Sequence, residues 1–91
     1  MYTKNTTITN DTGLHARPAS DFVRLATQYD SKIYIGKAEN DVKLDAKSIV
    51  MILALALKKG TVVEISADGS DEKQAVDALI GLIESGFPED D

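Results

Sequence analysis

The single histidine of this 91-residue chain, His15, lies close before a proline, Pro18. Proline has a fixed φ and no amide hydrogen, so Pro18 belongs in the first turn of a helix, and it predicts a helix start near Ala16. The amides of Ala16 and Arg17 then lie at the positive end of the helix dipole, and Arg17 adds a permanent cation. Such a site binds anions and favours a neutral, nucleophilic imidazole. The chemistry that it suits is transient phosphorylation of His15.

A simpler interpretation of the same residues stays open. His15 would only cap the helix, and Arg17 would be a solvated surface residue, although histidine is a poorer N-cap than Ser, Asp or Asn. The chain has no cysteine, so a transition-metal site would depend on carboxylates almost alone. We therefore expect neither a metal nor a cofactor.

Composition narrows the classes of partner. The net charge is −5, and binding to a nucleic-acid backbone needs a basic face, so we expect no nucleic-acid partner. The first residues lack the pattern of a signal peptide, and the longest apolar run, residues 49–57, is too short to span a bilayer. We expect a cytoplasmic monomer that does not insert into membranes, with residues 1–91 forming one domain.

Periodicity predicts seven elements in the order βαββαβα. Alternation around residues 7–9 indicates a strand, the apolar spacing over 16–26 a helix, and residues 33–35 and 42–44 a hairpin. A helix follows the capping residue Ser48 over 49–57, where Lys58-Lys59-Gly60 ends it, and a strand follows over 61–67. The last helix opens at Ser70 and ends at Gly86-Phe87-Pro88, and its apolar stripe consists of Ala75, Ala78, Leu79, Leu82 and Ile83. This order suits a two-layer α/β sandwich, an antiparallel or mixed sheet with helices on one face.

The residues Gly13-Leu14-His15-Ala16-Arg17-Pro18-Ala19 resemble the phosphorylation-site motif of the HPr family, the histidine-containing phosphocarriers of the phosphoenolpyruvate-dependent sugar phosphotransferase system. The similarity extends to chain length, element order and the segments 47–49, 59–60 and 65–69. It implies an open-faced β-sandwich of four antiparallel strands with three helices on one face. It also implies that phospho-enzyme I phosphorylates His15 on Nδ1, that an enzyme IIA domain receives the group, and that Arg17 and Ala16 stabilise it.

Ser48 is the second candidate site. In the regulatory branch of the family the corresponding serine is phosphorylated by an ATP-dependent kinase, the HPr serine kinase. That branch typically continues Ser-Ile-Met-Gly-Val-Met, whereas this chain reads Ser-Ile-Val-Met-Ile-Leu over residues 48–53, so it departs from the pattern. The apolar run that follows allows either a covered core helix or an exposed patch, and the second hypothesis places partner docking at Ile49, Met51 and Ile52.

Two alternatives to a sugar-branch carrier remain. The ending Ser85-Gly86-Phe87 is similar to that of NPr, the nitrogen-related phosphocarrier, which shares the histidine chemistry but serves regulatory partners. A regulatory HPr-like module without phosphorylation is the other alternative, and the retained His15 argues against it.

Overall fold

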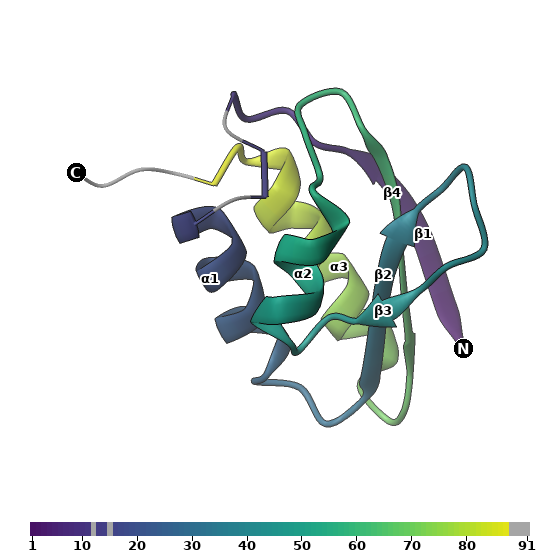
Figure 1. Ribbon diagram of the computed structural model, residues 1–91. Helices are drawn as coiled ribbons and strands as arrows, with labels where there is room; N and C mark the ends of the chain where they lie inside the picture. Colours follow the sequence, from purple (N-terminus) through teal and green to yellow (C-terminus); the bar gives the residue numbers. More distant parts are fainter. Residues whose placement is uncertain (12, 15, 88–91) are drawn as a thin grey trace.

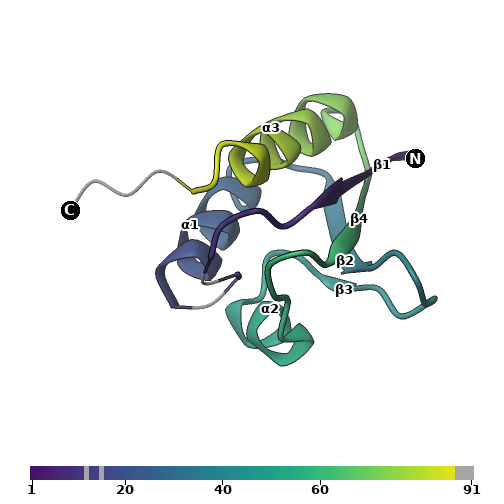
Figure 2. The ribbon, with the colours of Figure 1, turned by 90° about the horizontal axis from the view of Figure 1, so that it is seen from above.

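The computed structural model describes residues 1–11, 13–14 and 16–87, and it contains one sheet and three helices in that part of the chain. In chain order the elements are β1 (Tyr2–Thr7), α1 (Ala16–Ala26), β2 (Lys32–Lys37), β3 (Leu44–Asp45), α2 (Ile49–Leu55), β4 (Val62–Asp68) and α3 (Glu72–Glu84). All pairings are antiparallel, in the order β1-β4-β2-β3. The helices cover one face of the sheet and leave the other open (Figures 1 and 2). The predicted fold class is confirmed.

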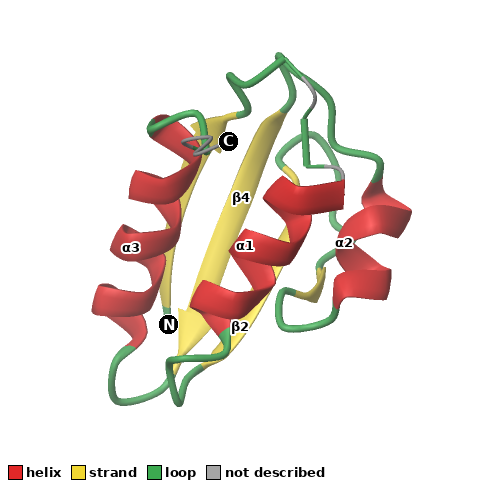
Figure 3. Ribbon diagram, turned by 90° about the vertical axis from the view of Figure 1, so that its left-hand side faces the viewer, coloured by secondary structure: helices red, strands yellow, loops and turns green. Residues whose placement is uncertain are grey.

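The core lies between the sheet and the helices. The predicted inward side of β4, made by Val63, Ile65 and Ala67, is fully buried. In α3 the predicted stripe is incomplete, because Val76 and Ile80 are buried as well. Leu82 is partly buried and packs against the core, as predicted, whereas Ala78 lies at the partly exposed margin of the helix. The reason is tertiary: α3 packs against α1 (Figure 3) as well as against β1 and β4, so a broader stripe is buried.

β1 lies earlier in the chain than its pattern indicated. The strand covers Tyr2–Thr7, whereas the alternation predicted it around Ile8. Ile8 closes the pairing, since its amide donates to the Thr61 carbonyl at 2.9 Å and its carbonyl accepts from the Gly60 amide at 2.8 Å. Most residues of the strand are polar and exposed because β1 is an edge strand, so its sequence carries little of the apolar alternation that identifies a strand.

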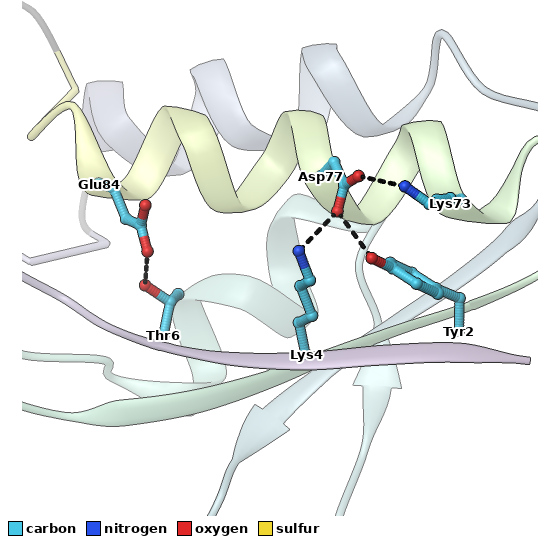
Figure 4. Close-up of polar contacts among 6 residues, drawn as sticks. All are labelled: Tyr2, Lys4, Thr6, Lys73, Asp77 and Glu84. Atoms are coloured by element: carbon cyan, nitrogen blue, oxygen red, sulfur yellow. Dashed lines mark hydrogen bonds and ion pairs between the residues drawn. The ribbon is translucent and has the colours of Figure 1, made fainter.

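Polar contacts join β1 to α3 where an apolar seam would be usual. Tyr2, Lys4 and Thr6 share the face of β1 that points to the helices (Figure 4). The Tyr2 hydroxyl donates to Asp77 at 3.1 Å, and Lys4 pairs with the same carboxylate at 3.1 Å. The Thr6 hydroxyl donates to Glu84 at 3.2 Å. The bond from Lys4 is the main cause that lowers the pKa of Asp77.

β3 is shorter than the predicted hairpin strand and excludes Val42. The loop before it folds onto the sheet at Gly36, where an added Cβ would lie 2.1 Å from the Val42 carbonyl oxygen. From this loop Lys43 reaches Glu64 of β4 at 3.2 Å. Loop contacts therefore replace the strand pairing that the alternation predicted.

α2 begins as predicted and ends earlier. The Ser48 hydroxyl accepts from the Met51 amide at 3.4 Å, which confirms the N-cap. The prediction that the helix continues to Leu57 is wrong, because Ala56 adopts the left-handed conformation with φ 51° and ψ 51°. This turn directs the Leu57 side chain into the core, where it is buried.

α3 begins at Glu72, two residues after the predicted opening at Ser70. Asp71 occupies the N-cap position, but its carboxylate makes no capping bond within the helix. It accepts instead from the Asp30 amide at 2.9 Å, from the Ser31 amide at 3.0 Å and from the Ser31 hydroxyl. These bonds tie the start of α3 to the connection between α1 and β2.

Candidate phosphorylation site

His15 and Thr12 lie outside the described residues, so the site is defined by the residues around them. Before His15, Leu14 is buried and its amide donates to the Leu57 carbonyl at 2.9 Å. Gly13 has a φ of 69°, a conformation that glycine adopts without strain, and it exchanges two bonds with Asn10. Its amide donates to the Asn10 carbonyl at 3.1 Å, and its carbonyl accepts from the Asn10 side chain at 2.8 Å. The chain is thus fixed immediately before residue 15.

After His15, α1 starts at Ala16, as Pro18 predicted. Ala16 and Arg17 are exposed, while Pro18 and Ala19 are buried and hold the first turn against the core. Ala16 has a φ of 48°, a conformation that costs a non-glycine residue about 1–2 kcal/mol. The amides of a first helical turn have no carbonyl partner inside the helix. Residues 16 and 17 therefore present an exposed, positively polarised helix end together with a guanidinium.

A second loop, residues 56–61 between α2 and β4, lies beside the connection that carries His15 (Figure 3). Besides the Leu57 carbonyl, it contributes Lys59, which forms an exposed ion pair with Asp11 at 2.8 Å. The hydrogen bond with Lys59 lowers the pKa of Asp11, and its counterpart raises the pKa of Lys59. The sequence analysis missed these contacts. No local pattern in the sequence indicates that Asp11 and Lys59, or Leu14 and Leu57, lie together.

α2 presents an exposed apolar surface beside α1. We call the α2 apolar surface the side chains of Ile49, Val50, Met51 and Leu53, which are 37%, 69%, 40% and 44% exposed. The expectation that Ile52 belongs to such a surface is wrong, because its side chain is completely buried. Ile52 belongs to the hydrophobic core, and Val50 and Leu53 complete the surface instead. Ser48 is half-buried at its edge.

Other kinds of site find no support among residues 1–11, 13–14 and 16–87. In these residues no group of three or more His, Cys, Asp or Glu side chains could hold a metal ion. None of the helices in the same part of the chain has the length and apolar composition needed to cross a membrane.

The four-stranded open sandwich, with the motif of residues 13–19 at the start of its first helix, is the architecture of a histidine phosphocarrier. Comparison with known proteins agrees. The family model described as the PTS HPr component phosphorylation site matches residues 2–85. The phosphocarrier protein HPr of Neisseria meningitidis is 40% identical over 89 residues, which are 98% of each chain. The phosphocarrier protein NPr of Proteus mirabilis is 41% identical over 83 residues, 91% of each chain.

Among solved structures, a crystal structure of HPr from Thermoanaerobacter tengcongensis is similar, with a TM-score of 0.91. It is 46% identical and the match covers 99% of both chains. The chain belongs to the HPr family, the phosphocarriers of the phosphotransferase system.

Proposed function

We propose that this chain serves the sugar branch of the phosphotransferase system, taking a phosphoryl group from phospho-enzyme I on Nδ1 of His15 and passing it to enzyme IIA domains. The observation that carries the proposal is the exposed start of α1. Ala16 and Arg17 follow the histidine directly and are exposed, while Leu14 before it and Pro18 after them are buried in the core. We expect the protein to act as one domain, as a monomer and in the cytoplasm.

The proposed phosphoryl transfer needs no side chain that carries a proton. The lone pair of Nδ1 forms a bond to phosphorus, while the bond between phosphorus and enzyme I breaks and leaves its electron pair on enzyme I. The first-turn amides and the Arg17 guanidinium stabilise the negative charge that arrives. Transfer to enzyme IIA reverses the roles, so the group has to be held loosely at an exposed position. Partners supply any further catalytic groups.

One alternative has specific support, and another remains open. The similarity to an NPr of nearly the same identity, together with the ending Ser85-Gly86-Phe87, favours the nitrogen branch as the second candidate. A regulatory HPr-like module that is never phosphorylated is the third.

The decisive experiment incubates the purified chain with phosphoenolpyruvate and either sugar-type or nitrogen-type enzyme I. We expect an acid-labile, base-stable phosphoryl group, formed faster with the sugar-type enzyme, and none on the variant His15→Ala. Faster phosphorylation by the nitrogen-type enzyme would move the chain to the NPr branch. Labelling of His15→Ala, or none of the wild type with either enzyme, would refute the proposal.

We also propose Ser48 as a regulatory phosphorylation site for an ATP-dependent serine kinase. Its hydroxyl lies at the N-cap of α2, where a phosphate would be stabilised by the helix end and would not unfold the helix. The same position borders the α2 apolar surface, so the added charge would oppose the approach of a partner.

A further inference from the structure

We propose that the loop of residues 56–61 is a positioning element of the phosphorylation site, acting through contacts of Gly13, Leu14 and Asp11 with Leu57 and Lys59. The proposal rests on the proposed role of His15, and it assigns a function to a loop that lies more than forty residues away in the chain. These contacts hold the residues that immediately precede the phosphorylated position. We call them the loop junction.

Hydrogen bonds hold both ends of the loop of residues 56–61. At one end Ile8 exchanges bonds with Thr61 and Gly60, at 2.9 and 2.8 Å, as a continuation of the sheet. At the other end the Leu14 amide donates to the Leu57 carbonyl at 2.9 Å, and both of these side chains are buried. The direction of the Leu57 carbonyl depends in turn on the left-handed turn at Ala56. This main-chain bond therefore connects the end of α2 to the residue before His15.

Gly13 makes this approach possible. A Cβ added at Gly13 would lie 2.3 Å from the Leu57 carbonyl oxygen and 3.0 Å from the Lys58 Cα. A Cβ in a real structure stays at least 3.0 Å from such an atom. Any side chain at position 13 would therefore have to increase its distance from the Leu57 carbonyl oxygen from 2.3 to 3.0 Å, which is a shift of 0.7 Å between the two segments. The atom that would have to move belongs to the main chain and cannot rotate away. The close contact fits a role in placing the loop at a set distance.

The Asp11–Lys59 ion pair closes the junction on its exposed side, at 2.8 Å. Exposed pairs of this kind contribute little to stability and weaken with salt. In this position the ion pair restrains the connection between β1 and α1 relative to the loop of residues 56–61. This restraint acts on the rate of phosphoryl transfer, so it can be measured separately from the free energy of unfolding.

The main test is Gly13→Ala, measured as kcat and KM for phosphorylation by enzyme I in folded protein. Misplacement of a reacting group by 1 Å can cost about a hundredfold in rate, so we expect kcat to fall by about tenfold or more with KM nearly unchanged. Gly86→Ala is the matched control, because Gly86 lies outside this loop and also has a positive φ, of 80°, but an added Cβ there meets nothing within 4 Å. It should keep the wild-type kcat. Wild-type kcat in folded Gly13→Ala, or an equal loss in Gly86→Ala, would overturn the proposal.

If Gly13→Ala does not fold, reversing the charge of Lys59 tests the same positioning role. Lys59→Asp places two like charges together and should lower kcat by about two- to fivefold. The double variant Asp11→Lys/Lys59→Asp restores the pair at the original net charge and should recover kcat to within about twofold of wild type. A change in KM alone, or no recovery in the double variant, would assign Lys59 to docking and refute the positioning role. Phosphorylation of the wild type in the same assay checks the proposed function separately.

Discussion

Replacing Val50 by aspartate tests whether partners bind on the α2 apolar surface. Complete burial of a valine side chain contributes about 1.5–3 kcal/mol. Since 69% of Val50 is exposed, a partner that covers it gains about 1–2 kcal/mol from this residue. Losing that contribution weakens binding by about five- to thirtyfold, and a charge buried in the interface weakens it further. The expected result is a rise of at least this size in the KM for enzyme I, with the free energy of unfolding almost unchanged.

Two variants make the assay specific. Val42→Asp introduces the same charge at another exposed valine, 57% exposed, in the β2–β3 loop away from α1 and α2 (Figure 1), and it should leave KM unchanged. Ile52→Ala removes a buried side chain from the same helix and should cost about 2–4 kcal/mol of unfolding free energy without raising KM. The reasoning is refuted if Val50→Asp keeps the wild-type KM, or if Val42→Asp raises KM equally.

Three further predictions concern individual side chains. Arg17→Ala should raise the barrier to phosphoryl transfer by about 1–3 kcal/mol. Arg17→Lys should recover only part of the lost transfer rate, because an ammonium group lacks the forked donors of the guanidinium, and wild-type rates in both variants would make Arg17 a solvated surface residue. Ser48→Ala should lower the free energy of unfolding by about 0.5–1 kcal/mol, since the capping bond is long at 3.4 Å. Ser48→Asp should keep the stability and slow association with enzyme I, and unchanged phosphorylation kinetics would leave Ser48 as a cap only. The Ser31 hydroxyl, followed by the Asp30 amide, lowers the pKa of Asp71, so this carboxylate stabilises the fold above its unfolded pKa of about 3.9, and the contribution is lost as pH falls through the lower folded value. Urea unfolding at pH 7 and pH 3 should therefore show a smaller acid-induced loss for Asp71→Asn than for the wild type, and equal losses would contradict this assignment.

Much of the fold could be predicted because its causes are local. Pro18 restricts the backbone and fixes the start of α1, and Ser48 caps α2 three residues before the amide that it accepts from. The inward side of β4 follows from strict alternation of apolar residues. Where a strand lies at the edge of the sheet, as β1 does, polar residues are tolerated on both of its faces, so the alternation of apolar and polar residues is lost.

The candidate site was predicted through its motif, and its surroundings were not. The type and spacing of His15, Ala16 and Arg17 indicate phosphoryl chemistry because a helix start, a cation and a nucleophile act within a few residues of one another. The side of α2 that is exposed depends on how the helix lies on the sheet. This rotation buries Ile52 and exposes Val50, and in a helix that is apolar nearly all round no sequence pattern fixes it.

The sequence by itself therefore determined the element order and the helix start at the candidate site, and it predicted which residue there is reactive. Only the tertiary structure decided which distant segment of the chain contacts that site. Asp11 and Lys59 are 48 residues apart, and the Leu57 carbonyl accepts from Leu14 only because Ala56 turns the chain left-handed at the end of α2. Backbone restrictions act between neighbours and can be recognised along the chain, whereas contacts between loops depend on how the helices pack on the sheet.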